Sequence, residues 1–194
     1  MSSASDEANS PILSALPRDT RELVEIFARR AVEFVVVGGW AVALHGYARA
    51  TKDFDVFIRP DAQNAERVLD ALREFGAPLA RLTVAELAKP GLIFQIGVAP
   101  FRIDIINAIE GVSFDEAIAE PLYAQVAGMS IRVIGKSALV KNKRAAGRPQ
   151  DLVDADKLED HASTSGRVGQ PRGGSTKGRA RHAARATTKK KKKK

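Results

Sequence analysis

The sequence predicts an α/β (α+β) fold in which a short mixed β-sheet is flanked by helices and followed by a disordered basic tail. Three observations carry this prediction. Short runs rich in valine, isoleucine and phenylalanine alternate with segments whose apolar residues recur at helical spacing. The first such run, residues 34–37, leads directly into a pair of glycines. A second run, residues 53–58, carries Asp53 and Asp55 two positions apart.

Apolar spacing and helix caps define the elements in the first half of the chain. Leu23, Ile26 and Phe27 recur at helical spacing, and the β-branched run that follows them predicts a buried strand. Asp61 can cap the next long helix and Gly76 can end it. We therefore expect a helix at residues 20–32, a strand at 34–37, a short helix at 40–45, a strand at 53–58 and a helix at 61–75.

Turn residues separate the elements in the second half. Pro100 divides two apolar runs and predicts a β-hairpin, and Gly128 divides a further pair. Gly147 and Pro149 interrupt a helical stretch and so predict two helices. The expected elements are a helical turn at 83–89, strands at 93–98 and 102–107, a short helix at 114–119, strands at 123–126 and 131–134, and helices at 137–146 and 151–159.

Charge is distributed unevenly along the 194 residues. Of the 31 Lys and Arg residues, twelve lie in residues 161–194, which contain no acid, whereas residues 1–160 hold all 23 Asp and Glu. The basic segment is low in complexity and has almost no large apolar residue, so we expect it to be disordered. The predicted organisation is a flexible leader at 1–17, one folded domain at 18–160 and a Lys/Arg-rich tail at 161–194. The tail either binds tRNA or another nucleic acid or only aids solubility.

Composition and motifs exclude several classes of protein. The absence of cysteine excludes disulfides and thiolate metal sites, and no apolar run approaches the roughly 20 residues of a membrane span. The N-terminal residues carry acids and serines rather than a signal-peptide pattern, so we expect a cytoplasmic protein with no membrane partner. P-loop, dinucleotide-binding and Gly-x-Ser-x-Gly hydrolase motifs are missing.

The two acids at Asp53 and Asp55 are the strongest functional signal. Residues at i and i+2 of a strand point to the same face, about 7 Å apart, so the carboxylates repel each other. A divalent cation between them removes this repulsion, and Mg²⁺ prefers such oxygen ligands. Asp104 lies between two isoleucines, where an unpaired carboxylate is costly. It either joins the same site or pairs with Arg102 or Lys52.

The glycine pair Gly38 and Gly39 stands where a strand turns into a helix. Without side chains, its backbone N–H groups are open to a phosphate. The alternative is that the turn alone requires glycine. A backbone that can bind phosphate, next to carboxylates that can bind Mg²⁺, is typical of an enzyme that acts on nucleotides.

This ordered set resembles the nucleotidyltransferase superfamily, whose fold is shared with DNA polymerase beta and kanamycin nucleotidyltransferase. The family pattern is a hydrophobic residue, Gly-Gly or Gly-Ser, a spacer, Asp-x-Asp between hydrophobic residues, and a third carboxylate on a later strand. The resemblance covers about residues 20–160. Within it the chain is similar to small bacterial AbiEii-like and minimal nucleotidyltransferases, through residues 38–47, 49–53 and 141–151.

The resemblance implies roles for individual residues. The catalytic, metal-binding residues would be Asp53, Asp55 and Asp104, which would hold two Mg²⁺ ions. The residues that would bind the phosphates of an NTP are Gly38, Gly39, Arg49, Thr51 and Lys143. The alternative for Lys143 is that it belongs, with Lys141 and Arg144, to an ordinary solvated basic face of a helix.

The resemblance also implies an activity, namely Mg²⁺-dependent transfer of a nucleoside monophosphate from an NTP to an acceptor hydroxyl. The acceptor would be an RNA end, a protein or a small molecule, in a toxin–antitoxin or phage-defence setting with a cognate protein partner. The alternative is a catalytically inactive protein of the same fold that acts as a regulator, an antitoxin or a nucleic-acid-associated module.

Overall fold

The computed structural model describes residues 16–47, 50–98 and 101–165, and its six-stranded sheet flanked by helices confirms the predicted fold class. The predicted tail beyond residue 165 and most of the predicted leader lie outside these residues. In chain order the elements are α2 (Arg18–Arg29), β1 (Phe34–Val36), α3 (Gly38–Leu44), β2 (Asp53–Ile58), α4 (Ala62–Phe75), α5 (Val84–Ala88), β3 (Ile93–Val98), β4 (Phe101–Ile106), α6 (Phe114–Ala117), β5 (Leu122–Val126), β6 (Met129–Val133), α7 (Lys136–Ala146) and α8 (Pro149–Ser165).

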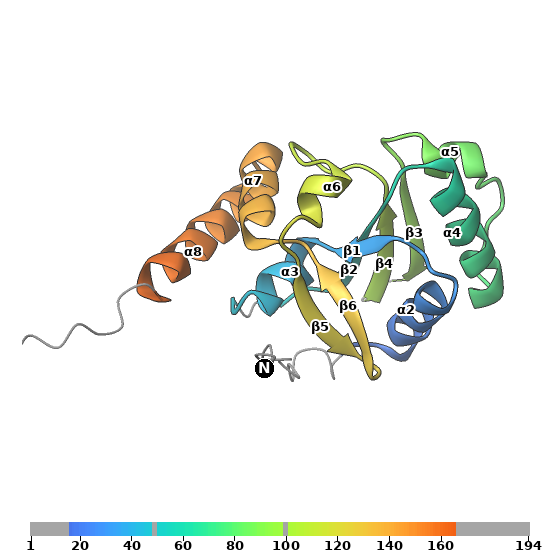
Figure 1. The fold of residues 1–194 in the computed structure, drawn as a ribbon, viewed down its shortest axis with the longest axis horizontal. Coiled ribbons are helices and arrows are strands. Elements are labelled where there is room, and N and C mark those ends of the chain that lie inside the picture. The colour runs from blue at the N-terminus through green and yellow to red at the C-terminus, as the bar shows by residue number, and fades with distance from the viewer. Residues whose placement is uncertain (1–15, 48–49, 99–100, 166–194) are drawn as a thin grey trace, which may run out of the picture.

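The sheet is mixed, with strand order β3-β4-β2-β1-β6-β5. The two central strands, β1 and β2, run antiparallel, and each pairs on its other side with a parallel strand, β6 and β4 respectively. Both outer strands arise as hairpins: β3 pairs with β4 and β5 pairs with β6. Helices α2, α4 and α5 lie towards one end of the molecule and the packed pair α7 and α8 towards the other (Figure 1).

Alternation along β2 divides its side chains between two faces. Phe54 packs against Trp40 of α3, with ring centroids 6.0 Å apart. On the opposite face Phe57 packs against Phe114 of α6, with centroids 5.3 Å apart. Because residues two apart in a strand share a face, the two aspartates of β2 lie on the α6 side. Helices therefore cover the apolar part of each face and leave the aspartate end of β2 open.

Most of the predicted helix ends are confirmed. Asp61 caps α4 by accepting a hydrogen bond from the Asn64 backbone N–H, and Gly76 ends the helix in the left-handed conformation. Two helices end two or more residues earlier than expected: α6 stops at Ala117, and α2 stops at Arg29 because Ala31 takes a positive φ of 51°. The turn redirects the chain into β1.

Two further helices differ from their predicted bounds at functionally relevant places. Helix α3 begins at Gly38 itself rather than after the glycine pair. Helix α8 begins at Pro149, whose missing N–H costs nothing in a first turn, and continues to Ser165, five residues past the expected domain end. Leu16, expected in the flexible leader, is buried in the core at 3% exposure. In the described ranges, no helix has the length and apolar character that a bilayer crossing requires.

Candidate active site

The parallel pairing of β2 and β4 brings the acidic residues together. Asp55 is the register partner of Asp104, and Asp53 is the register partner of Arg102. Register partners on neighbouring strands project to the same side of a sheet. The third carboxylate anticipated from the sequence therefore lies beside the first two, although it is 49 residues away from Asp55 along the chain.

A cleft of about 440 Å³ opens over this acidic face. Arg49, one of the eight predicted site residues, lies outside the described ranges. The structure also adds residues that sequence reasoning did not assign to the site, among them Gln95, Arg102 and Asp151. The other seven predicted residues all line the cleft: Gly38, Gly39, Thr51, Asp53, Asp55, Asp104 and Lys143.

The glycine pair and Asp55 are in close contact. A Cβ at Gly38 would stand 1.9 Å from Oδ2 of Asp55, and the backbone at Gly38 has a φ of +64°. Both facts require glycine at this position, one by space and the other by backbone conformation. The backbone N–H of Gly39 donates a hydrogen bond to the Asp55 carboxylate. The turn that begins α3 is thus built directly against the central aspartate.

Electrostatics in the cleft are dominated by crowded negative charge. Burial, followed by the neighbouring charges of Asp104 and Asp53, raises the pKa of Asp55 to about 7. The Lys143 ammonium and the Gly39 N–H oppose this shift but do not cancel it. The raised pKa of Asp55 therefore reflects burial first and the two neighbouring aspartates second.

Asp53 and Asp104 are each held by a neighbouring donor. Arg102 donates from Nε and Nη2 to the two oxygens of Asp53, at 3.0 and 2.9 Å. Asp53 in turn holds the pKa of Arg102 above its ordinary value, with smaller contributions from Asp104 and Asp55. Gln95 donates its amide to both oxygens of Asp104, at 3.3 and 3.1 Å. The sequence left open whether Asp104 joins the acidic site or pairs with Arg102 or Lys52. In the structure Arg102 bonds Asp53, so the pair of Asp104 with Arg102 does not form.

Lys143 is buried rather than solvated. Its ammonium lies 2.6 Å from Asp151 and 3.4 Å from Asp154, and its side chain is 7% exposed. The two neighbouring basic residues do fit the solvated alternative, because Lys141 pairs with Glu116 and Arg144 with Asp156 and Glu159 at exposed positions. Lys143 therefore faces the cleft from α7 while two acids of α8 fix its position.

The sequence contained signals for two of the residues it did not assign. Arg102 stands two positions before Asp104, so strand alternation places both on one face. Asp151 belongs to the segment 141–151 that contributes to the family resemblance, and it is an acid in the first turn of α8. Gln95 carries no such signal, because its contact depends on the β3–β4 register alone.

The metal-binding assignment has mixed support from the geometry. Oxygen atoms of Asp53, Asp55 and Asp104 on one face of the sheet are ligands of the kind that Mg²⁺ prefers. Over the described ranges, however, no group of three or more acidic, histidine or cysteine side chains is arranged to hold a metal ion. The donors from Arg102 and Gln95 occupy two of the three carboxylates. The residue types fit the metal.

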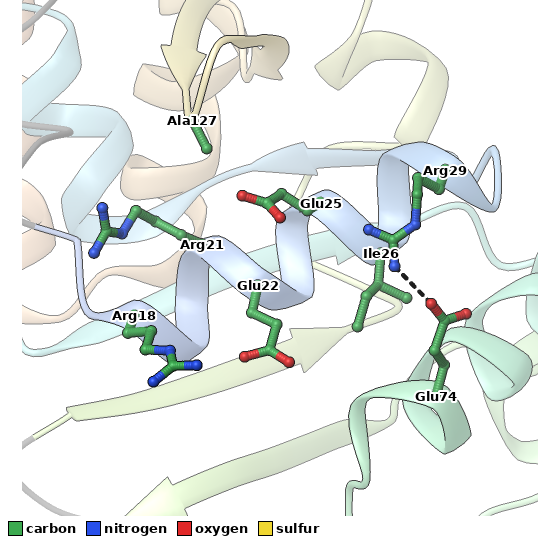
Figure 2. Close-up of a pocket in the computed structure, with 8 residues that line it drawn as sticks. All are labelled: Arg18, Arg21, Glu22, Glu25, Ile26, Arg29, Glu74 and Ala127. Atoms are coloured by element: carbon green, nitrogen blue, oxygen red, sulfur yellow. Dashed lines mark hydrogen bonds and ion pairs between the residues drawn. The ribbon is translucent and has the colours of Figure 1, made fainter.

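A second groove of about 440 Å³ runs along α2, away from the acidic cleft. Figure 2 shows most of its side chains along α2, with Arg29 directed at Glu74 of α4. Its charges are of both signs, and Arg29 bonds Glu74 at 2.6 Å. None of the predicted site residues lines this groove. We therefore place the candidate active site in the acidic cleft.

Two solved structures of the antibiotic-resistance factor ANT(2'')-Ia have a similar fold. The solution structure of the antibiotic-resistance factor ANT(2'')-Ia is 16% identical, with a TM-score of 0.50 over 76% of this chain and 82% of that one. The crystal structure of ANT(2'')-Ia in complex with adenylyl-2''-tobramycin is 16% identical, with a TM-score of 0.50 over 77% of this chain and 90% of that one. At these identities the similarity concerns the fold. No curated protein sequence matches the chain significantly.

The family assignment comes from the sequence profile of one protein family. That family is described as nucleotidyl transferase of unknown function (DUF2204), and its profile matches residues 17–170. The match includes every element from α2 to α8 and all the residues of the acidic cleft. Over this range the protein is a member of the DUF2204 family of nucleotidyl transferases.

Proposed function

We propose that the acidic cleft transfers a nucleoside monophosphate from an NTP to an acceptor hydroxyl, with Mg²⁺ as cofactor. One observation carries the proposal: the glycine turn at Gly38 is built directly against Asp55, whose register partner is Asp104. Backbone N–H groups that can bind phosphate thus lie next to carboxylates that can bind the cations that accompany phosphate.

The triphosphate would lie between the glycine turn and α7. Gly38 and Gly39 offer the backbone, and Lys143 offers the buried positive charge on the facing wall. Thr51 lines the same cleft, and Arg49, outside the described ranges, would complete the set. The ion pairs to Asp151 and Asp154 hold the Lys143 ammonium in place, so it would act from a fixed position.

The Mg²⁺ ions would be held by Asp53, Asp55 and Asp104. The family resemblance implies two such ions. Bound Mg²⁺ would neutralise charge on the phosphates and on the leaving pyrophosphate. Mg²⁺ bound beside Asp55 would also offset the repulsion from Asp104 and Asp53 that contributes to its raised pKa. The bound ions would thereby favour the carboxylate form of Asp55 at neutral pH.

In the transfer itself, the acceptor oxygen would form a bond to the α-phosphorus of the NTP. The bond between the α-phosphorus and the bridging oxygen to the β-phosphate would break, and pyrophosphate would leave with that electron pair. Asp104 is the base that would accept the proton of the acceptor hydroxyl. Gln95 donates to both Asp104 oxygens and so fixes the orientation of this carboxylate.

The acceptor is proposed only by chemical group, as a hydroxyl on an RNA end, a protein or a small molecule. The ANT(2'')-Ia structure with adenylyl-2''-tobramycin supports the small-molecule option, because its fold is similar to this one. The nucleic-acid arm at 161–194, the cognate toxin or antitoxin partner, the phage-defence setting and the cytoplasmic location stay predictions.

The test uses the four α-³²P-labelled NTPs with MgCl₂ and, separately, tRNA, an aminoglycoside mixture and lysate protein as acceptors. Label in an acceptor together with released pyrophosphate is the expected result, and Asp55→Asn should abolish both. Absence of pyrophosphate with every NTP and acceptor would support the inactive alternative. Label transfer that survives in Asp55→Asn would place the chemistry elsewhere.

A further inference from the structure

Arg102 is placed in the cleft as a cation among three acids. Its guanidinium holds both oxygens of Asp53 in a two-pronged contact, at 3.0 and 2.9 Å. The β2–β4 register sets this pair in direct opposition. Two positions further along the register, on the same face of the sheet, the opposed residues are Asp55 and Asp104, both acidic. The β2–β4 pairing therefore provides a counter-ion at one of these two same-face positions and none at the other.

A metal ion at Asp53 needs the same oxygens that Arg102 occupies. When both oxygens of a carboxylate accept hydrogen bonds from one guanidinium, the lone pairs best placed to bind a metal ion are in use. Among the described residues, the carboxylates do not form a ready metal cluster. The competing donor at Asp53 is Arg102, and Asp53 already shares one face of the sheet with Asp55 and Asp104.

We propose that Arg102 competes with a divalent cation for Asp53, so that metal binding has to break the Arg102–Asp53 pair. The inference rests on the proposed function, since it assumes that Asp53 is a metal ligand. Arg102 is thereby a positioning residue that sets how much free metal the empty site requires. It holds the Asp53 carboxylate oriented until the metal arrives.

The two cation–carboxylate pairs in the cleft differ in whether they can open. The side chains of Arg102 and Asp53 are 39% and 37% exposed, whereas those of Lys143 and Asp151 are 7% and 11% exposed. An exposed pair contributes a factor of only about 1.5 to 5 to an equilibrium, because water screens it and replaces its hydrogen bonds. A buried pair resists separation much more strongly. Arg102 can therefore yield to a doubly charged ion while Lys143 keeps its place.

The experiment is calorimetric titration of the full chain with MgCl₂, and separately MnCl₂, in the absence of nucleotide. Arg102→Gln should bind either ion about three- to tenfold more tightly than wild type, from the lost pair and the lost nearby positive charge. In an Asp53→Asn background, Arg102→Gln should change affinity less than twofold, because the contested carboxylate is gone. This double-mutant cycle isolates the pair from the general field of the guanidinium.

Arg148→Gln is the matched control. Arg148 also lines the cleft but lies 4.0 Å from Asp151 and does not contact Asp53. It removes the same charge, and we expect an affinity change of less than twofold. Circular dichroism melting of every variant shows that the compared proteins are folded.

Two results overturn the inference in distinguishable ways. If wild type binds Mg²⁺ through Asp53 and Arg102→Gln binds it no more tightly, competition by Arg102 is wrong while the metal site stands. If neither wild type nor Arg102→Gln binds Mg²⁺ or Mn²⁺, with or without a non-hydrolysable NTP, the metal part of the proposed function fails as well. An equal gain from Arg148→Gln would reduce the effect to net charge and also refute the pairing.

Discussion

Replacing Asp55 by asparagine should stabilise the metal-free protein at neutral and alkaline pH. In the folded chain, burial and the charges of Asp104 and Asp53 raise the pKa of Asp55 from 3.8 to about 7. Ionised Asp55 therefore destabilises the fold. Asparagine has nearly the same shape, carries no charge, and can still accept the hydrogen bond from the Gly39 N–H.

The pH dependence follows from these two pKa values. Below pH 4 the carboxyl group is protonated in both the folded and the unfolded chain, so it contributes no difference. Between pH 4 and pH 7 the unfolded chain loses this proton while the folded chain keeps it, and the free energy of unfolding of wild type falls. Above pH 7 the loss levels off at about 4 kcal/mol at most, since each pKa unit corresponds to 1.36 kcal/mol. We expect Asp55→Asn to recover about 2–4 kcal/mol at pH 8 and almost nothing at pH 4.

Urea unfolding in EDTA, followed by circular dichroism at pH 4, 6 and 8, measures this difference. Asp53→Asn is the control, because it removes an ion pair with Arg102 and should be neutral or slightly destabilising. An Asp55→Asn protein no more stable than wild type at pH 8 would refute the electrostatic account of the cleft. Addition of MgCl₂ should raise the stability of wild type and leave Asp55→Asn nearly unchanged.

Three further perturbations test other parts of the site. Gly38→Ala should cost about 2–4 kcal/mol in urea unfolding and abolish transfer, because its Cβ would meet Asp55 at a positive φ; Gly76→Ala, with the same φ sign but open space, should cost only about 1 kcal/mol. Lys143→Met should cost about 3–5 kcal/mol, since it leaves Asp151 and Asp154 buried without their cation, and a second change, Asp154→Asn, should recover part of the loss; an undiminished melting temperature in Lys143→Met would contradict this. Removal of residues 166–194 takes away twelve Lys and Arg residues; if about half of them bind phosphates, filter binding of tRNA or duplex DNA at several salt concentrations should lose a log–log slope of roughly 4 to 5, and equal slopes for both proteins would exclude a nucleic-acid arm.

Local patterns predicted the parts of this protein that depend on neighbours in sequence. Asp53 and Asp55 share a face because every strand alternates, whatever it pairs with. Asp61 and Gly76 delimit α4 because capping acts within one turn of a helix. The motif from Gly38 to Asp104 likewise indicated the family, because the order and types of its residues can be read from the sequence without the fold.

Tertiary structure decided what depends on strand register and helix packing. Nothing local to Arg102 places it opposite Asp53 and not opposite Asp55, because a parallel register is fixed by the whole sheet. Lys143 sits in a basic run that is typical of a solvated face, yet the packing of α8 on α7 buries it between Asp151 and Asp154. The raised pKa of Asp55 likewise needs burial and charges from another strand. The sequence alone indicated which residues are candidates for the chemistry. The fold decided which of them are paired, because charge pairing depends on distances between segments far apart in the chain.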